Sequence, residues 1–171
     1  MYTYNAFREK QSGIDFWWDE VDTHLQLRRD LIPSLLDRAR PLMGSQHSIL
    51  DRIAAIREEI VQAAVSANSL DVGRDMEHLE NRLSAEMRSL SGAFRQNRDV
   101  QMNSSLLTVM SELVSIEGKA ITACEEYNKL TALFNASIKS FPANLVVGML
   151  QFNPLEKRIF GDWDDKAEKK P

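Results

Sequence analysis

Few side chains in this sequence could carry out chemistry, and their spacing matches no catalytic or metal-binding motif. The three histidines, His24, His47 and His78, fall on separate segments without HExxH, HxH or Cys/His spacing. The sequence also lacks the Glu-x-x-His pairs of di-iron bundles and any glycine-rich phosphate loop. We therefore predict that the chain is not an enzyme and has no catalytic residue, no metal ligand and no cofactor.

The cysteine content and the charge balance exclude further classes of function. Cys124 is the only cysteine, and its apolar neighbours at helical spacing favour a small core residue over a nucleophile. The chain has 25 acidic and 21 basic residues, and the basic ones are interspersed with acids. We expect no nucleic acid partner and no small-molecule substrate.

The elements that position these residues are predicted to be long helices. Apolar residues recur at spacings of three and four, which predicts an all-α fold: a long antiparallel up-and-down four-helix bundle with a short C-terminal extension. The predicted helices cover approximately residues 3–40, 46–70, 72–97 and 103–141. We predict a single domain, residues 1–160, that includes a short fold-back segment at 145–160, followed by a polar, disordered tail at 161–171. No run of 18 apolar residues occurs, so we expect this chain alone to be soluble.

Charged residues interrupt three of the four apolar seams. The interrupting residues are Arg28 in the first helix, Glu86 in the third and Glu117 in the last. If the first and last helices are antiparallel with aligned ends, Arg28 lies near residue 120, one turn from Glu117. We predict a buried or half-buried ion pair between Arg28 and Glu117. The alternative is a local rotation that places Leu27 and Ile116 in the core and both charges at the solvated rim.

Pro33 lies in the middle of the first predicted helix. Proline cannot donate a hydrogen bond to the carbonyl of Arg29, and its ring crowds the same turn, so we expect a bent helix at this point. Because the seam continues beyond Pro33, a bend is favoured over a break.

Two apolar regions are candidates for a contact surface. Trp17 and Trp18 cannot both face one core. In one interpretation Trp18 is core and Trp17 covers a neighbouring helix; in the other, Trp17 belongs to a contact surface. The segment at 145–160 either folds back onto the end of the bundle or contacts a membrane or a partner. The predicted membrane-proximal contact surface consists of Trp17, Leu145, Val146, Met149 and Phe152.

The sequence resembles the LemA family in three blocks that together cover most of the chain. These are "YNAF" at 4–7, "VDTHLQLRRDLIPSLL" at 21–36 and "IEGKAITACEEYNKLTALFNASIKSFPANLV" at 116–146, and "LENRLSAEM" at 79–87 echoes the family as well. The resemblance implies a helical bundle tethered to a bacterial membrane by one N-terminal transmembrane helix, with the bundle on the cytoplasmic side. That anchor would end just before the YN dipeptide and is absent from this chain.

The resemblance also bears on individual residues and on function. Asn128 and Asn135 match the family motif, and we predict that their amides make polar contacts between helices. No enzymatic activity is established across the family, so we expect a scaffold module that binds as yet unidentified protein partners. The alternative is a self-associating coiled-coil protein, including a role in the magnetosome membrane, to which one branch of the family belongs. The stretch "AFRQNRDVQMN" departs from the usual family text, which is compatible with a specialised branch.

Overall fold

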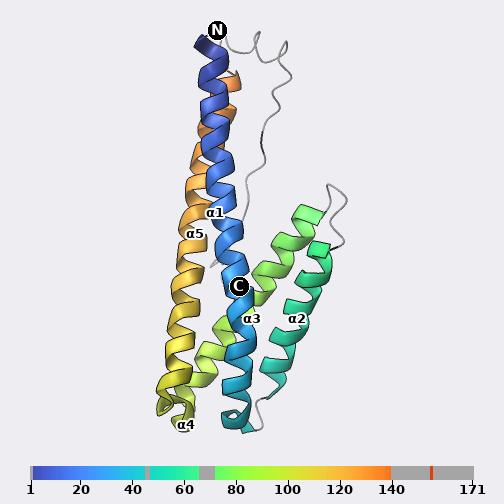
Figure 1. Cartoon of the computed structure of the whole chain (residues 1–171), viewed down its shortest axis with the longest axis vertical. Helices are drawn as coiled ribbons and strands as arrows, with labels where there is room; N and C mark the ends of the chain where they lie inside the picture. The colour runs from blue at the N-terminus through green and yellow to red at the C-terminus, as the bar shows by residue number, and fades with distance from the viewer. Residues whose placement is uncertain (1, 45–46, 66–71, 140–154, 156–171) are drawn as a thin grey trace, which may run out of the picture. The chain divides into compact units, whose positions relative to one another are not determined.

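The computed structural model describes residues 2–44, 47–65, 72–139 and 155 of the chain (Figure 1). Every regular element among these residues is helical, which confirms the predicted all-α class. The elements are α1 (Tyr2–Ala39), the short 3-10 helix η1 (Arg40–Leu42), α2 (His47–Val65), α3 (Val72–Gln96), α4 (Arg98–Gln101) and α5 (Ser104–Lys139). The tail at 161–171 and all of the predicted fold-back segment except Leu155 lie outside the described residues.

The connection between α3 and α5 contains a short helix that the apolar pattern did not predict. Asn97 caps α4, because its side-chain oxygen accepts hydrogen bonds from the backbone N–H groups of Asp99 and Val100. The amide nitrogen of the same side chain donates to the carbonyl of Leu42 at 2.8 Å. One asparagine therefore starts a helix and ties it to the end of η1.

The chain divides into two compact units. Unit 1 comprises Met1–His24 and Gly118–Arg158, and unit 2 comprises Leu25–Glu117 and Ile159–Pro171. The helices α1 and α5 contribute to both units, whereas α2, α3 and α4 belong to unit 2 alone.

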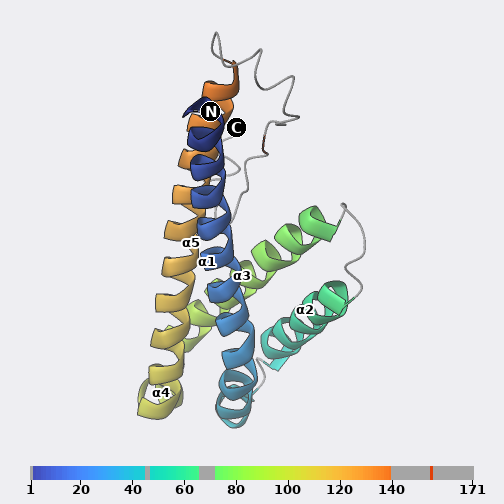
Figure 2. The ribbon, with the colours of Figure 1, turned by 45° about the horizontal axis from the view of Figure 1, so that its top comes forward.

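In unit 1, the first part of α1 packs antiparallel against the last part of α5. The ring of Phe7 meets that of Phe134 edge to face at 6.0 Å, and the ring of Trp18 lies 5.3 Å from that of Tyr127. As residue numbers rise along α1 they fall along α5, so the two segments run in opposite directions (Figure 2). The buried core of this unit consists of Phe7, Ile14, Tyr127, Phe134 and Ile138.

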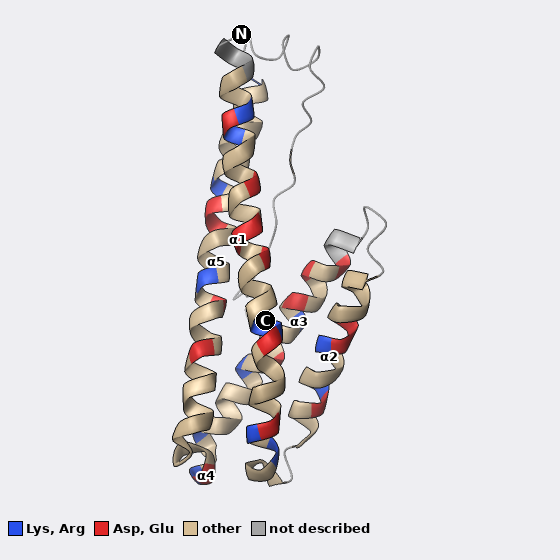
Figure 3. Cartoon of the chain, viewed as in Figure 1, with Lys and Arg blue, Asp and Glu red and all other residues tan. Residues whose placement is uncertain are grey.

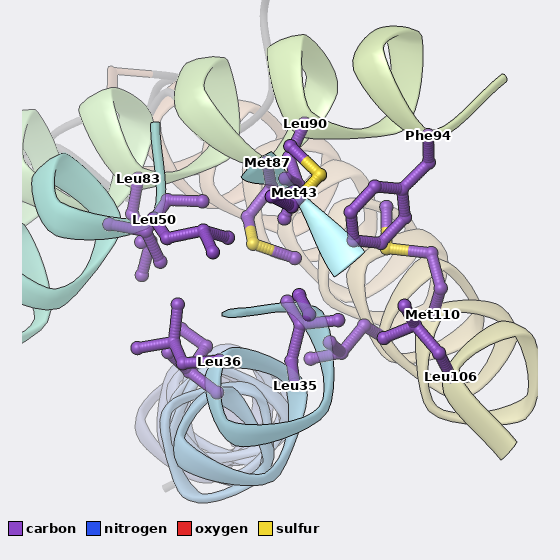
Figure 4. Packing of buried hydrophobic residues seen from close by; sticks show 14 of the residues in the cluster. Leu35, Leu36, Met43, Leu50, Leu83, Met87, Leu90, Phe94, Leu106 and Met110 are labelled. Carbon is purple, nitrogen blue, oxygen red and sulfur yellow. The ribbon is translucent and has the colours of Figure 1, made fainter. Parts of the chain in front are cut away.

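In unit 2, segments of α1, α2, α3 and α5 enclose a larger apolar core. Figure 4 shows leucine and methionine side chains from these helices pointing toward one another. Residues with 0% exposure are Ile32, Leu35, Ala39, Leu50, Ile53, Ile60, Leu83, Leu90, Val100 and Leu106. The turn after η1 requires a glycine, because Gly44 has a φ of 48°, in the left-handed region that side chains with a Cβ rarely adopt. No helix within the described ranges is long and apolar enough to cross a membrane.

Candidate functional site

The most unusual buried group in the described chain is the guanidinium of Arg28, the first residue of the "RRDLIP" stretch. Arg28 is 1% exposed and is among the largest fully buried side chains. Its Nη2 donates to Oε2 of Glu80 at 2.5 Å and to the backbone carbonyl of Glu80 at 3.1 Å. Its Nη1 donates to Oγ of Ser84 at 2.5 Å. Arg28 therefore joins α1 to α3 by three hydrogen bonds.

The carboxylate of Glu80 is shared between two arginines. Its exposure is 2%, and Oε1 accepts a hydrogen bond from Nη1 of Arg29 while Oε2 accepts the one from Arg28. Glu117 of α5 completes the group, with its carboxylate 3.7 Å from Nη1 of Arg28. We call Arg28, Arg29, Glu80, Ser84 and Glu117 the arginine cluster. Two positive and two negative side chains balance here, which offsets much of the cost of removing them from water.

The structure thus brings the predicted pair, Arg28 and Glu117, within ion-pair distance but gives Arg28 a closer partner. Glu117 keeps 20% of its side chain exposed, whereas Glu80 is buried. The alternative rotation occurs only in part: Ile116 is buried, but Leu27 is 46% exposed and Arg28 keeps the core position. The prediction was incomplete because it named no partner from α3.

Sequence reasoning missed Glu80 because the buried face of α3 lies slightly to one side of the predicted seam. That seam ran through Leu79, Leu83 and Glu86, yet Glu86 pairs with Arg52 at the surface. Glu80 and Ser84, which lie one turn apart, take the buried positions instead. The sequence did contain a signal for both residues, because Glu80 and Ser84 lie in "LENRLSAEM" at 79–87, a segment that resembles the family.

Pro33 leads to a second hydrogen-bonded connection between helices of unit 2, from α2 to α1. The helix α1 continues through Pro33, as the periodic seam indicated. Since proline has no N–H, the carbonyl of Arg29 lacks its usual donor four residues later. Nε of Arg57, on α2, donates to that carbonyl at 2.9 Å. Arg28, Arg29 and Pro33 therefore all connect α1 to other helices.

Of the two asparagines of the family motif, Asn135 bonds to a residue outside the helices. The side chain of Asn135 donates to the carbonyl of Leu155 at 2.8 Å and accepts from its N–H at 2.9 Å. Leu155 also packs against the core of unit 1. The prediction is corrected here: Asn135 holds the chain after α5, not a neighbouring helix. The amide of Asn128 lies 3.7 Å from Sγ of Cys124, one turn earlier on the same helix.

The aromatic residues of α1 are arranged differently from the first interpretation. The prediction that Trp18 is core is wrong, because Trp18 is 36% exposed, with its ring 5.3 Å from that of Tyr127. Successive residues of a helix point 100° apart, so Trp17 is half-buried against the core of unit 1 while Phe16 is 54% exposed. The rings of Phe16 and Trp17 meet at 5.3 Å. The other predicted contact residues, Leu145, Val146, Met149 and Phe152, lie outside the described residues.

The part of α1 around Phe16 is acidic. Asp15, Asp19 and Asp22 are exposed, and no lysine or arginine occurs between Lys10 and Arg28 (Figure 3). We call Asp15, Phe16, Asp19 and Asp22 the outer face of α1. This face combines an exposed aromatic ring with one sign of charge.

Within the described residues, no group of three histidine, cysteine, aspartate or glutamate side chains is placed to hold a metal ion. His24 lies 3.6 Å from Glu20 on its own helix. Cys124, the single cysteine of the sequence, is buried.

Comparison with protein families identifies the family of this chain. The model of the LemA family matches residues 17–171, which include the arginine cluster, Pro33, Asn135 and Leu155. A comparison with curated proteins finds no match.

Proposed function

The chain belongs to the LemA family, and from that premise we propose that it is a non-enzymatic helical module that binds a protein partner at a bacterial membrane. Membrane attachment through an N-terminal anchor and a cytoplasmic position for the bundle are parts of this proposal. Family membership supports the attachment, and the surface of α1 supports the binding of a protein.

The observation that carries the proposal is the exposure of Phe16. A phenylalanine that is 54% exposed on a regular helix loses the apolar burial that it would gain in a core. Its ring is held by the edge-to-face contact with Trp17, which is itself anchored in the core of unit 1. A rigid, exposed aromatic side chain is typical of the anchor residues of protein–protein interfaces.

The arginine cluster supports a scaffold function in a second way. Buried polar networks define the register between helices more than they stabilise the fold. Arg28 is bonded to α3, and Arg57 of α2 is bonded to the carbonyl of Arg29. These bonds hold α1 in a defined register, as required of a helix that presents a surface to a partner.

Binding through the outer face of α1 is tested by photo-crosslinking in cells that express the natural gene. We place benzoylphenylalanine at position 16 and, as a matched control, at Glu58, an exposed position on α2. Position 16 is expected to give a discrete product of higher mass that position 58 does not give. Equal crosslinking at both positions, or none at position 16, would contradict the proposal.

Membrane attachment is tested separately by alkaline carbonate extraction of the same cells. An anchored protein stays in the membrane pellet, because carbonate removes proteins held only by peripheral contacts. Release into the supernatant would remove the anchor from the proposal and would leave the binding surface to be judged by crosslinking alone.

A further inference from the structure

Unit 2 carries a groove between α3 and α5 whose lining includes Ser84 and Glu117 of the arginine cluster. Its volume is about 240 Å³, and it is lined by Ser84, Met87, Arg88, Ser91, Arg95, Met110, Leu113, Val114 and Glu117. This volume is below the roughly 300–1,000 Å³ of sites for small molecules. The groove is suited to one anchoring side chain of a protein segment.

The floor of the groove is apolar and adaptable. Met87, Met110 and Leu113 form it, and all three are buried. Methionine side chains are flexible and polarizable, and their sulfur atoms make favourable contacts with aromatic rings. An aromatic side chain is therefore a well-matched occupant.

The α3 wall of the groove is positively charged. Arg88 and Arg95 are both exposed, and they lie seven residues apart, which places them on one side of the helix about 10.5 Å apart. The single carboxylate in the lining, that of Glu117, lies 3.7 Å from Arg28. The groove therefore favours an acidic segment whose charges lie two helical turns apart.

The outer face of α1 has the complementary pattern. Asp15 and Asp22 are exposed and also lie seven residues apart, with Asp19 between them on the same side of the helix. Phe16 projects about 100° around the helix from Asp15. If α1 of another molecule lay in the groove with Phe16 on the methionine floor, Asp15 and Asp22 would therefore face the α3 wall.

We propose that the α3–α5 groove of one molecule binds the outer face of α1 of a second copy, with Phe16 on Met87 and Met110, and Asp15 and Asp22 paired with Arg88 and Arg95. This proposal rests on the proposed function and names its first partner. The two surfaces differ, so the contact is heterologous: each copy uses its groove for one neighbour and its outer face for another. Such contacts build rings or open chains of molecules.

The test is self-association of the full 171-residue chain, measured by sedimentation velocity over a wide range of concentration. The wild-type protein is expected to form species larger than a monomer, and fewer of them as salt rises, because screening shortens the reach of exposed charges.

Two variants each reverse the charge of one surface: Arg88→Glu/Arg95→Glu in the groove and Asp15→Lys/Asp22→Lys on the outer face of α1. Each is expected to weaken association at least about tenfold, since like charges then face each other. A matched control, Glu58→Lys/Glu125→Lys, changes exposed acids outside both surfaces and should associate as the wild type does.

Mixing the two reversed variants provides the decisive measurement. The acidic groove of one then meets the basic outer face of the other, so association is expected to return in the mixture although each variant alone associates at least about tenfold more weakly than the wild type. Circular dichroism of each variant checks that the helices are intact. A wild-type chain that stays monomeric at all concentrations, or a mixture that stays monomeric, would overturn the proposal.

The crosslinking experiment separates this proposal from the proposed function. A product at position 16 that contains two copies of the chain supports both. A product that contains a different protein, together with a monomeric wild type, overturns self-association and leaves the proposed function standing. No product at position 16 contradicts the proposed function.

Discussion

At the scale of single residues, the main feature is Arg28, a buried arginine at a position of α1 where an apolar side chain is expected. Arg28 occupies a seam position, and Glu80, Ser84 and Glu117 surround its guanidinium. Such a group adds little net stability compared with well-packed apolar side chains, but breaking it is costly because a charge stays buried without its partner. The cluster therefore constrains which helices pair and in which register.

The first prediction concerns the carboxylate that both arginines share. Glu80→Gln keeps the shape of the side chain but leaves Arg28 and Arg29 with one fewer negative charge in a buried site. We expect the free energy of unfolding to fall by about 3 kcal/mol, measured by urea denaturation followed by circular dichroism.

Two other carboxylates serve as controls for this prediction. Glu117→Gln, at a half-buried position, should cost less, and Glu86→Gln should cost no more than about 1 kcal/mol, because its partner Arg52 is exposed. A loss for Glu80→Gln as small as that for Glu86→Gln would mean that the arginine cluster does not hold the helices together.

At the scale of elements, α1 lacks a backbone hydrogen bond at Pro33, and this position is where α1 is bonded to α2. Pro33 leaves the carbonyl of Arg29 without its helical donor, and Arg57 of α2 supplies a replacement. An unsatisfied backbone carbonyl in a partly buried position is unfavourable, so the two helices are joined where α1 is weakest. The stability of α1 near Pro33 therefore depends on its contact with α2.

The second prediction tests this interdependence with a double-mutant cycle. Arg57→Met alone should lower the free energy of unfolding by about 1 kcal/mol, since the carbonyl of Arg29 loses its donor. In a Pro33→Ala background the loss should be much smaller, because the N–H of the new alanine can donate to the same carbonyl. The coupling energy from urea denaturation is expected to be about 1 kcal/mol.

The surface pair Arg52 and Glu86 supplies the control for the cycle. The guanidinium of Arg52 pairs with Glu86 on α3, and this hydrogen bond raises the pKa of Arg52. Arg52→Met therefore removes an arginine of α2 whose ion pair is with α3 and not with α1. Its effect should add to that of Pro33→Ala. Additivity for Arg57→Met as well would show that the bond to the Arg29 carbonyl contributes nothing.

At the scale of the whole molecule, two compact units share two helices. The tryptophans of α1 belong to unit 1, whereas most of the large apolar core belongs to unit 2. Because α1 and α5 each continue from one unit into the other, we expect the units to unfold together. A single cooperative transition is usual for single domains of up to about 150 residues, and the two shared helices lead us to expect it for this 171-residue chain as well.

The third prediction places a fluorescent reporter in unit 1 and a destabilising substitution in unit 2. In a Trp163→Phe background, the tryptophan fluorescence comes from Trp17 and Trp18 of unit 1. Leu83→Ala in the core of unit 2 should lower stability by about 2–5 kcal/mol. We expect the midpoints of the fluorescence and circular dichroism transitions to fall by the same amount. A fluorescence midpoint that stays at the wild-type value would show that the units unfold independently.

The sequence by itself determined the helices of this protein and the family to which it belongs. Apolar spacings of three and four predict where the long helices begin and end, because the period of an α-helix is a local property of the backbone. The same pattern placed Arg28 on an apolar stripe, and the spacing of histidines and carboxylates matched no catalytic or metal-binding motif. The blocks at 21–36 and 116–146 were sufficient to indicate the LemA family, to which the chain belongs.

Only the tertiary structure decided which neighbour each residue meets. The choice of Glu80 over Glu117 as the closest partner of Arg28, the outward position of Trp18 and the bond of Asn135 to Leu155 all depend on helices or segments far apart in the chain. A periodic pattern gives the direction of a side chain to within about one residue around the helix, or 100°. Which surface lies in that direction depends on how all the helices pack together, and that is a property of the fold and not of any one helix.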